Sequence, residues 1–356
     1  MSADPVLRGR AGIQNAGDSV RDLVLPDVDA VRASESDVDT ATKACAAVVE
    51  ILCRCRQIER LTCSDVLTTW ILVSGEAASN WAKLKRLVVL HAGGMDSPLY
   101  HGYFAHLRQF SALRQLDLDL SSDAAEPFGP LGAPRPRTIG QSPIMSLRLV
   151  GGEGLATSGA ALFVADLARL TNLELILCNR VDIRPLLRAC PATLLRLSIE
   201  VEHDPNDGLA IEPLDVEADL RRFVHLRKLK LGACTYAPTC ELFDVLYAHL
   251  PRLREVTLTR GTRLVADKVL YYVLARGGPA RQLDKLVLDS IVAITEPLPS
   301  QVPDDSDVAN GTLDLDMFWT PPAWTPSFTL ADARALIAAA ERAGVKLEGS
   351  TVRAVE

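Results

Sequence analysis

The sequence lacks the cysteine and histidine patterns of a metal-bound or disulfide-held protein. Its 8 cysteines form no CxxC pair, and no histidine stands at ligand spacing from them, so a zinc site is not expected. At 356 residues the chain is also too long for a small disulfide scaffold. We expect reduced, mostly buried thiols in a cytoplasmic or nuclear protein.

A membrane-directed segment and an excess of basic residues are also missing. No apolar run reaches the roughly 18 residues that a membrane helix needs, and residues 1–12 lack the apolar core of a signal peptide. The net charge is −7 and the isoelectric point about 5.5, which argues against a dedicated nucleic-acid binder and, more weakly, against an anionic membrane surface. We therefore expect neither nucleic acid nor membrane as a partner.

The known catalytic motifs are absent as well. The sequence has no GxxxxGK[ST] phosphate loop, no HExxH metal motif and no GxSxG nucleophile elbow. Gly151-Gly152-Glu153-Gly154 departs from GxGxxG spacing and predicts a plain turn. No serine or cysteine can be assigned as nucleophile to any of the 6 histidines. We expect no enzyme activity, no cofactor and no metal.

What the sequence does contain is a repeat. The pattern LxxLxL, with other aliphatic residues or Cys at the Leu positions, occurs ten times. From Ile58 onward the first positions are separated by 26, 29, 31, 29, 21, 32, 27 and 30 residues, close to the leucine-rich-repeat period. The ten copies are Val20-Leu23-Leu25, Ile58-Leu61-Cys63, Leu84-Leu87-Val89, Leu113-Leu116-Leu118, Ile144-Leu147-Leu149, Leu173-Ile176-Cys178, Leu194-Leu197-Ile199, Leu226-Leu229-Leu231, Leu253-Val256-Leu258 and Leu283-Leu286-Leu288.

This pattern predicts an α/β leucine-rich-repeat solenoid. The last two Leu positions lie two residues apart, so they share the inner face of a short strand, while the residues between them point to the other face. One strand and one helix cannot bury a core alone, but stacked repeats cover one another. We expect a horseshoe with short parallel strands on the concave face and helices on the convex face. The predicted helices are residues 38–55, 65–80, 98–110, 155–170, 183–189, 216–223, 240–250 and 266–275.

The C-terminal segment predicts a cap for the repeats. Thr329 followed by Asp332 fits an N-terminal capping pattern, and residues 333–343 are strong helix formers. Gly344 suits the position after a helix end, and residues 345–347 predict a last short strand. The expected organisation is an N-terminal extension or partial cap at 1–19, about ten irregular repeats at 20–290, a flexible acidic insertion with prolines and aromatics at 291–327, and a capping helix and strand at 328–356.

Several repeats resemble the cysteine-containing leucine-rich repeats. Cys190-Pro191 with Leu194, Leu197 and Ile199 looks like the CPxLxxLxL start of that subtype, and the repeats at Cys55 and Pro251 are similar but carry only one of the two residues. The subtype is typical of F-box leucine-rich-repeat proteins, the substrate receptors of ubiquitin ligases, and the irregular repeats resemble fungal members. No F-box is visible in residues 1–37.

The outward strand positions and one insertion are the candidate binding residues. The candidates on the concave face are Asp117, Asp119, Arg148, Arg196, Glu200, Lys228, Lys230 and Thr257. The acidic insertion adds Phe318, Trp319 and Trp324, because aromatic anchors dominate binding energy at interfaces. The same insertion could instead be a solvated loop.

The resulting hypothesis is a scaffold that binds protein partners. The specific role implied by the resemblance is a substrate-recognition subunit of a ubiquitin ligase, with a Skp1-type adaptor as a further partner. A free-standing scaffold without a ubiquitin link and a leucine-rich-repeat regulator of GTPases are the alternatives. If the strand at Val20-Leu23-Leu25 pairs into the sheet, this counts against an F-box there.

Overall fold

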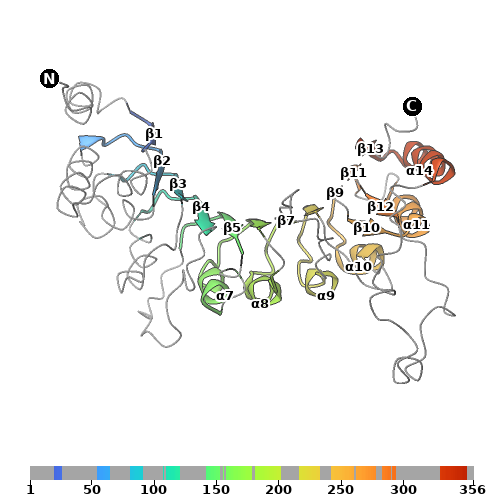
Figure 1. Ribbon diagram of the computed structural model, residues 1–356, viewed down its shortest axis with the longest axis horizontal. Coiled ribbons are helices and arrows are strands. Elements are labelled where there is room, and N and C mark those ends of the chain that lie inside the picture. Colours follow the sequence, from blue (N-terminus) through green and yellow to red (C-terminus); the bar gives the residue numbers. More distant parts are fainter. Residues whose placement is uncertain are drawn as a thin grey trace, which may run out of the picture. The chain divides into compact units, whose positions relative to one another are not determined.

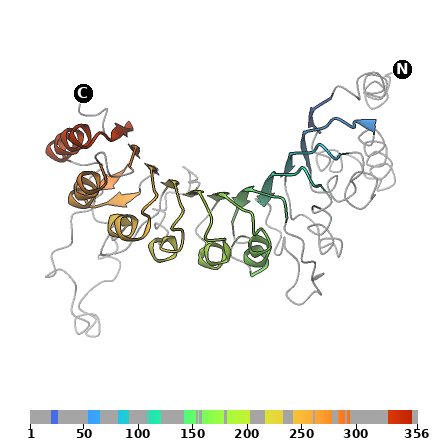
Figure 2. The ribbon, with the colours of Figure 1, turned by 180° about the vertical axis from the view of Figure 1, so that it is seen from behind.

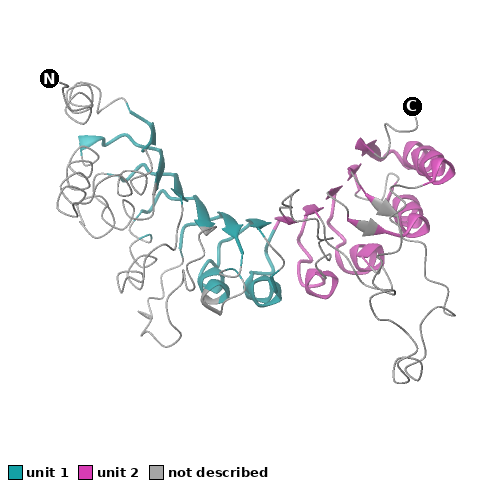
Figure 3. Cartoon of the chain, viewed as in Figure 1, with its two compact units in different colours: residues 1–194, 202–205 teal, residues 195–201, 206–356 magenta. Residues whose placement is uncertain are grey.

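The computed structural model describes residues 20–25, 54–64, 81–90, 107, 110–120, 142–152, 155, 158–178, 181–201, 216–232, 242–259, 262–277, 283–289, 291–293 and 329–350. The chain forms two compact units (Figure 3). Unit 1 comprises residues 1–194 and 202–205, and unit 2 comprises residues 195–201 and 206–356. Each unit is described separately.

Unit 1 is built on six parallel strands that stand side by side in chain order, counting only its described residues. Helices α7 (Ser158–Ala165) and α8 (Arg184–Ala189) pack against one another on one side of these strands (Figure 1). The strands are β1 (Asp22–Val24), β2 (Arg60–Ser64), β3 (Arg86–Leu90), β4 (Gln115–Leu120), β5 (Ser146–Gly151) and β6 (Asn172–Leu177).

Unit 2 repeats the same construction with β7 (Arg196–Val201), β8 (Lys228–Gly232), β9 (Glu255–Thr259), β11 (Lys285–Leu288) and β13 (Lys346–Glu348), all parallel. Its helices are α9 (Glu217–Leu220), α10 (Leu242–His249), α11 (Ala266–Arg276) and α14 (Leu330–Ala343). Seen from the front and from behind, the helices of each unit lie on one side of its strands (Figures 1 and 2). The opposite side of each sheet, which we call the open face, carries no described helix.

The inward Leu positions make the core, as the pattern predicts. In the β3 and β4 repeats, Leu84, Leu87, Leu113 and Leu116 are at most 2% exposed. A tight turn precedes several strands, in which the amide of the first Leu donates to the carbonyl three residues earlier, as from Leu84 to Trp81 at 3.0 Å. The carbonyl just before most strands accepts two consecutive amides of the next repeat, which fixes the register of neighbouring strands.

The predicted register of the sixth repeat is wrong. Strand β6 buries Leu173 and Leu175, and their cross-strand partners are the inward residues of β5. The first position is Leu170, which is fully buried, whereas Ile176 lies on the open face and Cys178 is exposed. Leu173 fits both registers, so the pattern alone could not separate them. With Leu170 as the start, the spacings of 29 and 21 residues become 26 and 24, which is closer to the common period.

The other predicted strands are confirmed, as are five helices: α7, α8, α9 and α10 are shorter than predicted, and α11 ends one residue later than predicted. The short parallel pair β10 (Arg263–Leu264) and β12 (Val292–Ala293) was not predicted. Predicted helices 38–55, 65–80 and 98–110 lie almost wholly outside the described residues, as does the insertion after residue 293. The expected boundaries at 19, 290 and 327 therefore stay predictions, and the division near residue 195 is an addition to them.

The C-terminal cap has the predicted form. The Thr329 side chain accepts from the amide of Asp332 while the Asp332 carboxylate accepts from the amide of Thr329, so both halves of the capping box are present. Gly344 ends α14 in the left-handed conformation, with φ of 68°. Strand β13 follows and pairs with β11 as the last strand of the sheet in unit 2.

Glu348 ties this last strand to the sheet, and it gives a prediction about pH. Its carboxylate lies 2.6 Å from the Nζ atoms of both Lys285 and Lys346. Hydrogen bonds from these lysines lower the pKa of Glu348 from 4.5 to about 2. A carboxyl pKa that is lower in the folded state stabilises the fold above the unfolded pKa, and this contribution is lost as pH falls from about 4.5 through about 2.

We therefore expect Glu348→Gln to lower the unfolding midpoint slightly at neutral pH and to differ less from the wild type as pH approaches 2. The effect is small because the pair is solvent-accessible. Urea unfolding at a series of pH values measures it. A difference between the two proteins that stays constant over this pH range would contradict the role given to Glu348.

A single arginine links helices α10 and α11. The Arg276 guanidinium donates to the carbonyls of Leu246, Tyr247, Leu250 and Pro251 at 2.7–3.2 Å, and it lies 5.4 Å from the centre of the Tyr247 ring. The last carbonyls of a helix have no partner within the helix, and a cation near them is favourable. Arg276 therefore serves as the C-terminal cap of the preceding helix.

We expect Arg276→Met to lower the stability of unit 2 by about 1.5–3 kcal/mol, the usual range for hydrogen bonds that involve a charged group. The methionine keeps the apolar part of the side chain, so the loss of stability reflects the missing hydrogen bonds from the guanidinium. Arg276→Lys should recover part of it, because the charge stays while the planar set of donors is lost. Urea unfolding of the wild type and the two variants measures these differences in stability. Equal midpoints would exclude the capping role.

Candidate functional site

The open face of unit 1 carries polar and apolar side chains in rows. Strand residues alternate between buried and half-buried, as in β3 and β5. Since the strands pair in register, residues at the same repeat position lie side by side. One such row consists of Val88, Asp117, Arg148 and Glu174 on four successive strands.

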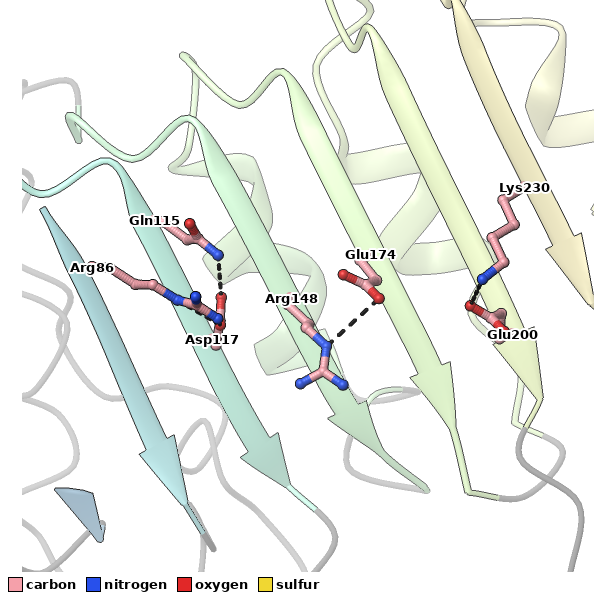
Figure 4. Close-up of polar contacts among 7 residues, drawn as sticks. All are labelled: Arg86, Gln115, Asp117, Arg148, Glu174, Glu200 and Lys230. Carbon is pink, nitrogen blue, oxygen red and sulfur yellow. Dashed lines mark hydrogen bonds and ion pairs between the residues drawn. The ribbon is translucent and has the colours of Figure 1, made fainter. Parts of the chain in front are cut away.

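The centre of this row is a buried carboxylate. Asp117 is 2% exposed, yet it lies on the face opposite the helices. Arg86, on the neighbouring strand, forms an ion pair with it and donates from Nε to Oδ2 at 3.1 Å, while Nε2 of Gln115 donates to Oδ1 at 3.2 Å (Figure 4). The flat guanidinium covers the carboxylate and compensates for the water that it has lost.

Beside this cluster the face combines charged and apolar side chains, and Asp119 lies in register with Val150. Arg148 Nε lies 3.6 Å from Oε1 of Glu174, and both side chains are exposed enough to meet a partner (Figure 4). The next row contains Val150 and Ile176 side by side, both half-buried. Charged groups next to apolar ones are typical of protein interfaces, where a desolvated centre is ringed by polar contacts.

The open face of unit 2 is more strongly charged. Lys230 lies 2.5 Å from Glu200 (Figure 4), whose side chain is only 11% exposed. Lys228 lies 2.6 Å from Glu255 on the next strand. Gly232 stands between Glu200 and Thr259, and a Cβ added there would lie 3.0 Å from Thr259 Oγ1. The missing side chain therefore avoids a close contact with Thr259.

The structure places all eight predicted face residues on strands, three in unit 1 and five in unit 2. It brings Lys230 and Glu200 together, and Thr257 lies in register with Lys230. Of these candidates Asp117 and Glu200 are nearly buried, so their carboxylates position the neighbouring cations and are not accessible to a ligand. The unit 1 candidates are Asp117, Asp119 and Arg148, with Arg196 at the start of unit 2.

Two residues of the unit 1 cluster were missed by the sequence prediction. Arg86 occupies the same repeat position as Arg196, so the template itself could have identified it. Glu174 occupies the position of Arg148 only in the corrected register of the sixth repeat, so the register error hid it. The aromatic candidates Phe318, Trp319 and Trp324 lie outside the described residues.

Among the described residues there is no group of three or more His, Cys, Asp or Glu side chains arranged to hold a metal ion. In the same part of the chain, none of the helices combines the length and apolar character that crossing a membrane requires. Cys55, Cys63 and Cys190 are buried, as expected. Cys190 donates from Sγ to the carbonyl of Leu186 at 3.3 Å and so closes the end of α8.

Comparison with known proteins gives similar structures but no family. No protein-family model matches the sequence, and no curated protein matches it either. The leucine-rich-repeat-containing protein LegL7 from Legionella pneumophila is 16% identical, over 88% of this chain and 97% of that one, with a TM-score of 0.34. The LRR protein LIC12759 from Leptospira interrogans is 14% identical, over 81% of this chain and 64% of that one, with a TM-score of 0.36.

TLR13, crystallised in complex with ssRNA13, is 15% identical, over 79% of this chain and 31% of that one, with a TM-score of 0.36. The chain thus spans 64% of the LIC12759 chain and 31% of the TLR13 chain. Likeness at this level concerns the fold alone. The chain's own parallel strands and their register define a leucine-rich-repeat solenoid.

Proposed function

We propose that this protein is a non-catalytic scaffold that binds protein partners on its open faces. One observation carries the proposal: in each unit the described helices lie on one side of the sheet, while the other side presents charged and polar side chains in register across successive strands. Side chains held by ion pairs lose less freedom when a partner binds. A surface of this kind suits macromolecular partners.

Affinity purification from the native host tests this proposal. The open-face variant Arg148→Ala/Arg196→Ala/Lys228→Ala removes side chains from both units, and Arg184→Ala/Lys268→Ala/Arg334→Ala removes as many cations away from these faces. We expect proteins captured by the wild type and the control to be lost from the open-face variant. Equal capture by all three would contradict binding at the open faces.

A narrower role as the substrate-recognition subunit of a ubiquitin ligase, in the cytoplasm or nucleus, is favoured by Cys190. This cysteine is 2% exposed and closes α8 just before the next repeat strand, as the cysteine of a CPxLxxLxL repeat would. Against this role, β1 pairs with β2, so residues 22–24 belong to a repeat strand and not to an F-box.

The same purification separates these roles. Recovery of a Skp1-type adaptor with a cullin would support the ubiquitin-ligase role, and recovery of a small GTPase would support a GTPase regulator. Reproducible recovery of other proteins alone would leave a free-standing scaffold.

A further inference from the structure

The strand starts on the open face of unit 2 carry a band of basic side chains. In the repeats of unit 2 the two residues just before the second Leu position are exposed or half-buried, except in the last repeat, where Val345 is buried and only Lys346 is exposed. The exposed or half-buried ones are Leu195, Arg196, Arg227, Lys228, Arg254, Glu255, Asp284, Lys285 and Lys346. Six of these nine positions are Arg or Lys and two are acidic, although the whole chain has a net charge of −7. We call these nine residues the basic band.

Part of the band is already neutralised within the protein. Lys228 lies 2.6 Å from Glu255, and Arg254 lies 3.8 Å from Asp284. Lys285 and Lys346 share the carboxylate of Glu348. These pairs fix the cations in place and leave their outer surfaces accessible.

Two arginines of the band have no ion-pair partner within the described part of the chain. Arg196 on β7 and Arg227 at the start of β8 are both exposed, and Arg196 lies in register with Lys228. Adjacent parallel strands are roughly 4.8 Å apart, so these three cations form a compact group. Lys228 is paired with Glu255, but Arg196 and Arg227 have no such partner among the described residues, and a bound anion would relieve the repulsion among these like charges.

We propose that the basic band binds an acidic, extended segment of a partner protein, an inference that rests on the proposed scaffold function. A carboxylate can bind two donors of a guanidinium at once, so glutamate or aspartate side chains fit Arg196 and Arg227 directly. Carboxylates spaced along an extended chain could follow the cations from one strand to the next.

The arrangement favours a polypeptide over a nucleic acid. Glu255, Asp284 and Glu348 interrupt the band, and they would repel a continuous row of phosphates. The open-face strand positions of unit 2 within the described residues include no aromatic side chain on which a base could stack. A peptide can place neutral residues opposite these carboxylates, which a sugar-phosphate backbone cannot do.

Binding of a labelled peptide of alternating Glu and Ser to the full chain tests the inference. The variants are Arg196→Glu/Arg227→Glu and the control Arg169→Glu/Arg334→Glu, which changes net charge equally at exposed positions outside the band. We expect wild type and control to bind the peptide alike, the band variant to bind at least tenfold more weakly, and added salt to weaken binding by the wild type. Circular dichroism shows whether both variants are folded.

Three results would overturn the inference: equal binding by the band variant, equal weakening in the control, or tighter binding of a mixed-sequence single-stranded RNA than of the peptide. Any of them would leave the scaffold function intact if host proteins captured by the wild type are still lost from the open-face variant described above. If the open-face variant and its control both capture the same host proteins as the wild type, the scaffold function itself is contradicted.

Discussion

Leu229→Asp should abolish the folded structure of unit 2. Leu229 is 2% exposed at the centre of β8, and its cross-strand partners are Leu197 and Val256, which are equally buried. The substitution removes apolar burial and places an unpaired carboxylate between repeats, and this combination costs more than about 4 kcal/mol. Thermal unfolding followed by far-ultraviolet circular dichroism should show loss of the helix and strand signal of this unit at ordinary temperature.

Leu229→Val is the matched control. It removes a single methylene and leaves the site apolar, so we expect a loss of only about 0.5–1.5 kcal/mol. If Leu229→Asp melts like the wild type, then β8 is not a core strand and the repeat assignment fails. If both variants lose structure equally, the loss reflects packing volume and not a buried charge.

Arg86→Met should destabilise unit 1 more than removal of a surface ion pair. It leaves the carboxylate of Asp117, which is 2% exposed, without its cation. Removal of one partner of a fully buried ion pair costs about 3–5 kcal/mol. Because the Arg86 side chain is 40% exposed, we expect a loss below that range but above the roughly 1 kcal/mol of an exposed pair. Urea unfolding of the full chain, analysed for the transition of unit 1, measures the effect.

Two further variants separate charge from packing. Arg60→Met removes the exposed pair with Asp22, in which both side chains are about two-thirds exposed (66% and 65%), and we expect a loss below about 1 kcal/mol. Arg86→Met/Asp117→Leu removes both partners of the pair, and its stability should return close to the wild type. A loss for Arg86→Met no larger than that for Arg60→Met would show that Asp117 needs no cation.

The fold was predictable because the repeat pattern states which residues face inward. Ten strands and the final cap follow from Leu spacing, from Thr329 with Asp332, and from Gly344. The sixth repeat failed because Leu173 fits two registers, and only pairing with β5 selects one. Strands β10 and β12 have two residues each and show no alternation that a sequence could reveal.

The site was less predictable, because side-chain partners depend on neighbouring strands. The sequence places Asp117 on the outward face, which suggests that it is accessible. Its burial depends on Arg86, which is 31 residues earlier and becomes a neighbour only through the register of β3 and β4. Glu200 likewise pairs with Lys230 on the next strand, a contact that depends on the pairing of β7 with β8. Sequence periodicity gives the direction of a side chain but not what covers it.

Cross-linking of the captured complex with a lysine-reactive reagent tests the central claim most directly. Lys228, Lys230 and Lys285 lie on the open face of unit 2, whereas Lys268 lies on helix α11. Binding at the open face predicts cross-links from the three strand lysines to the partner and few from Lys268. Cross-links to the partner from Lys268 alone would place it on the helices and contradict the proposed function.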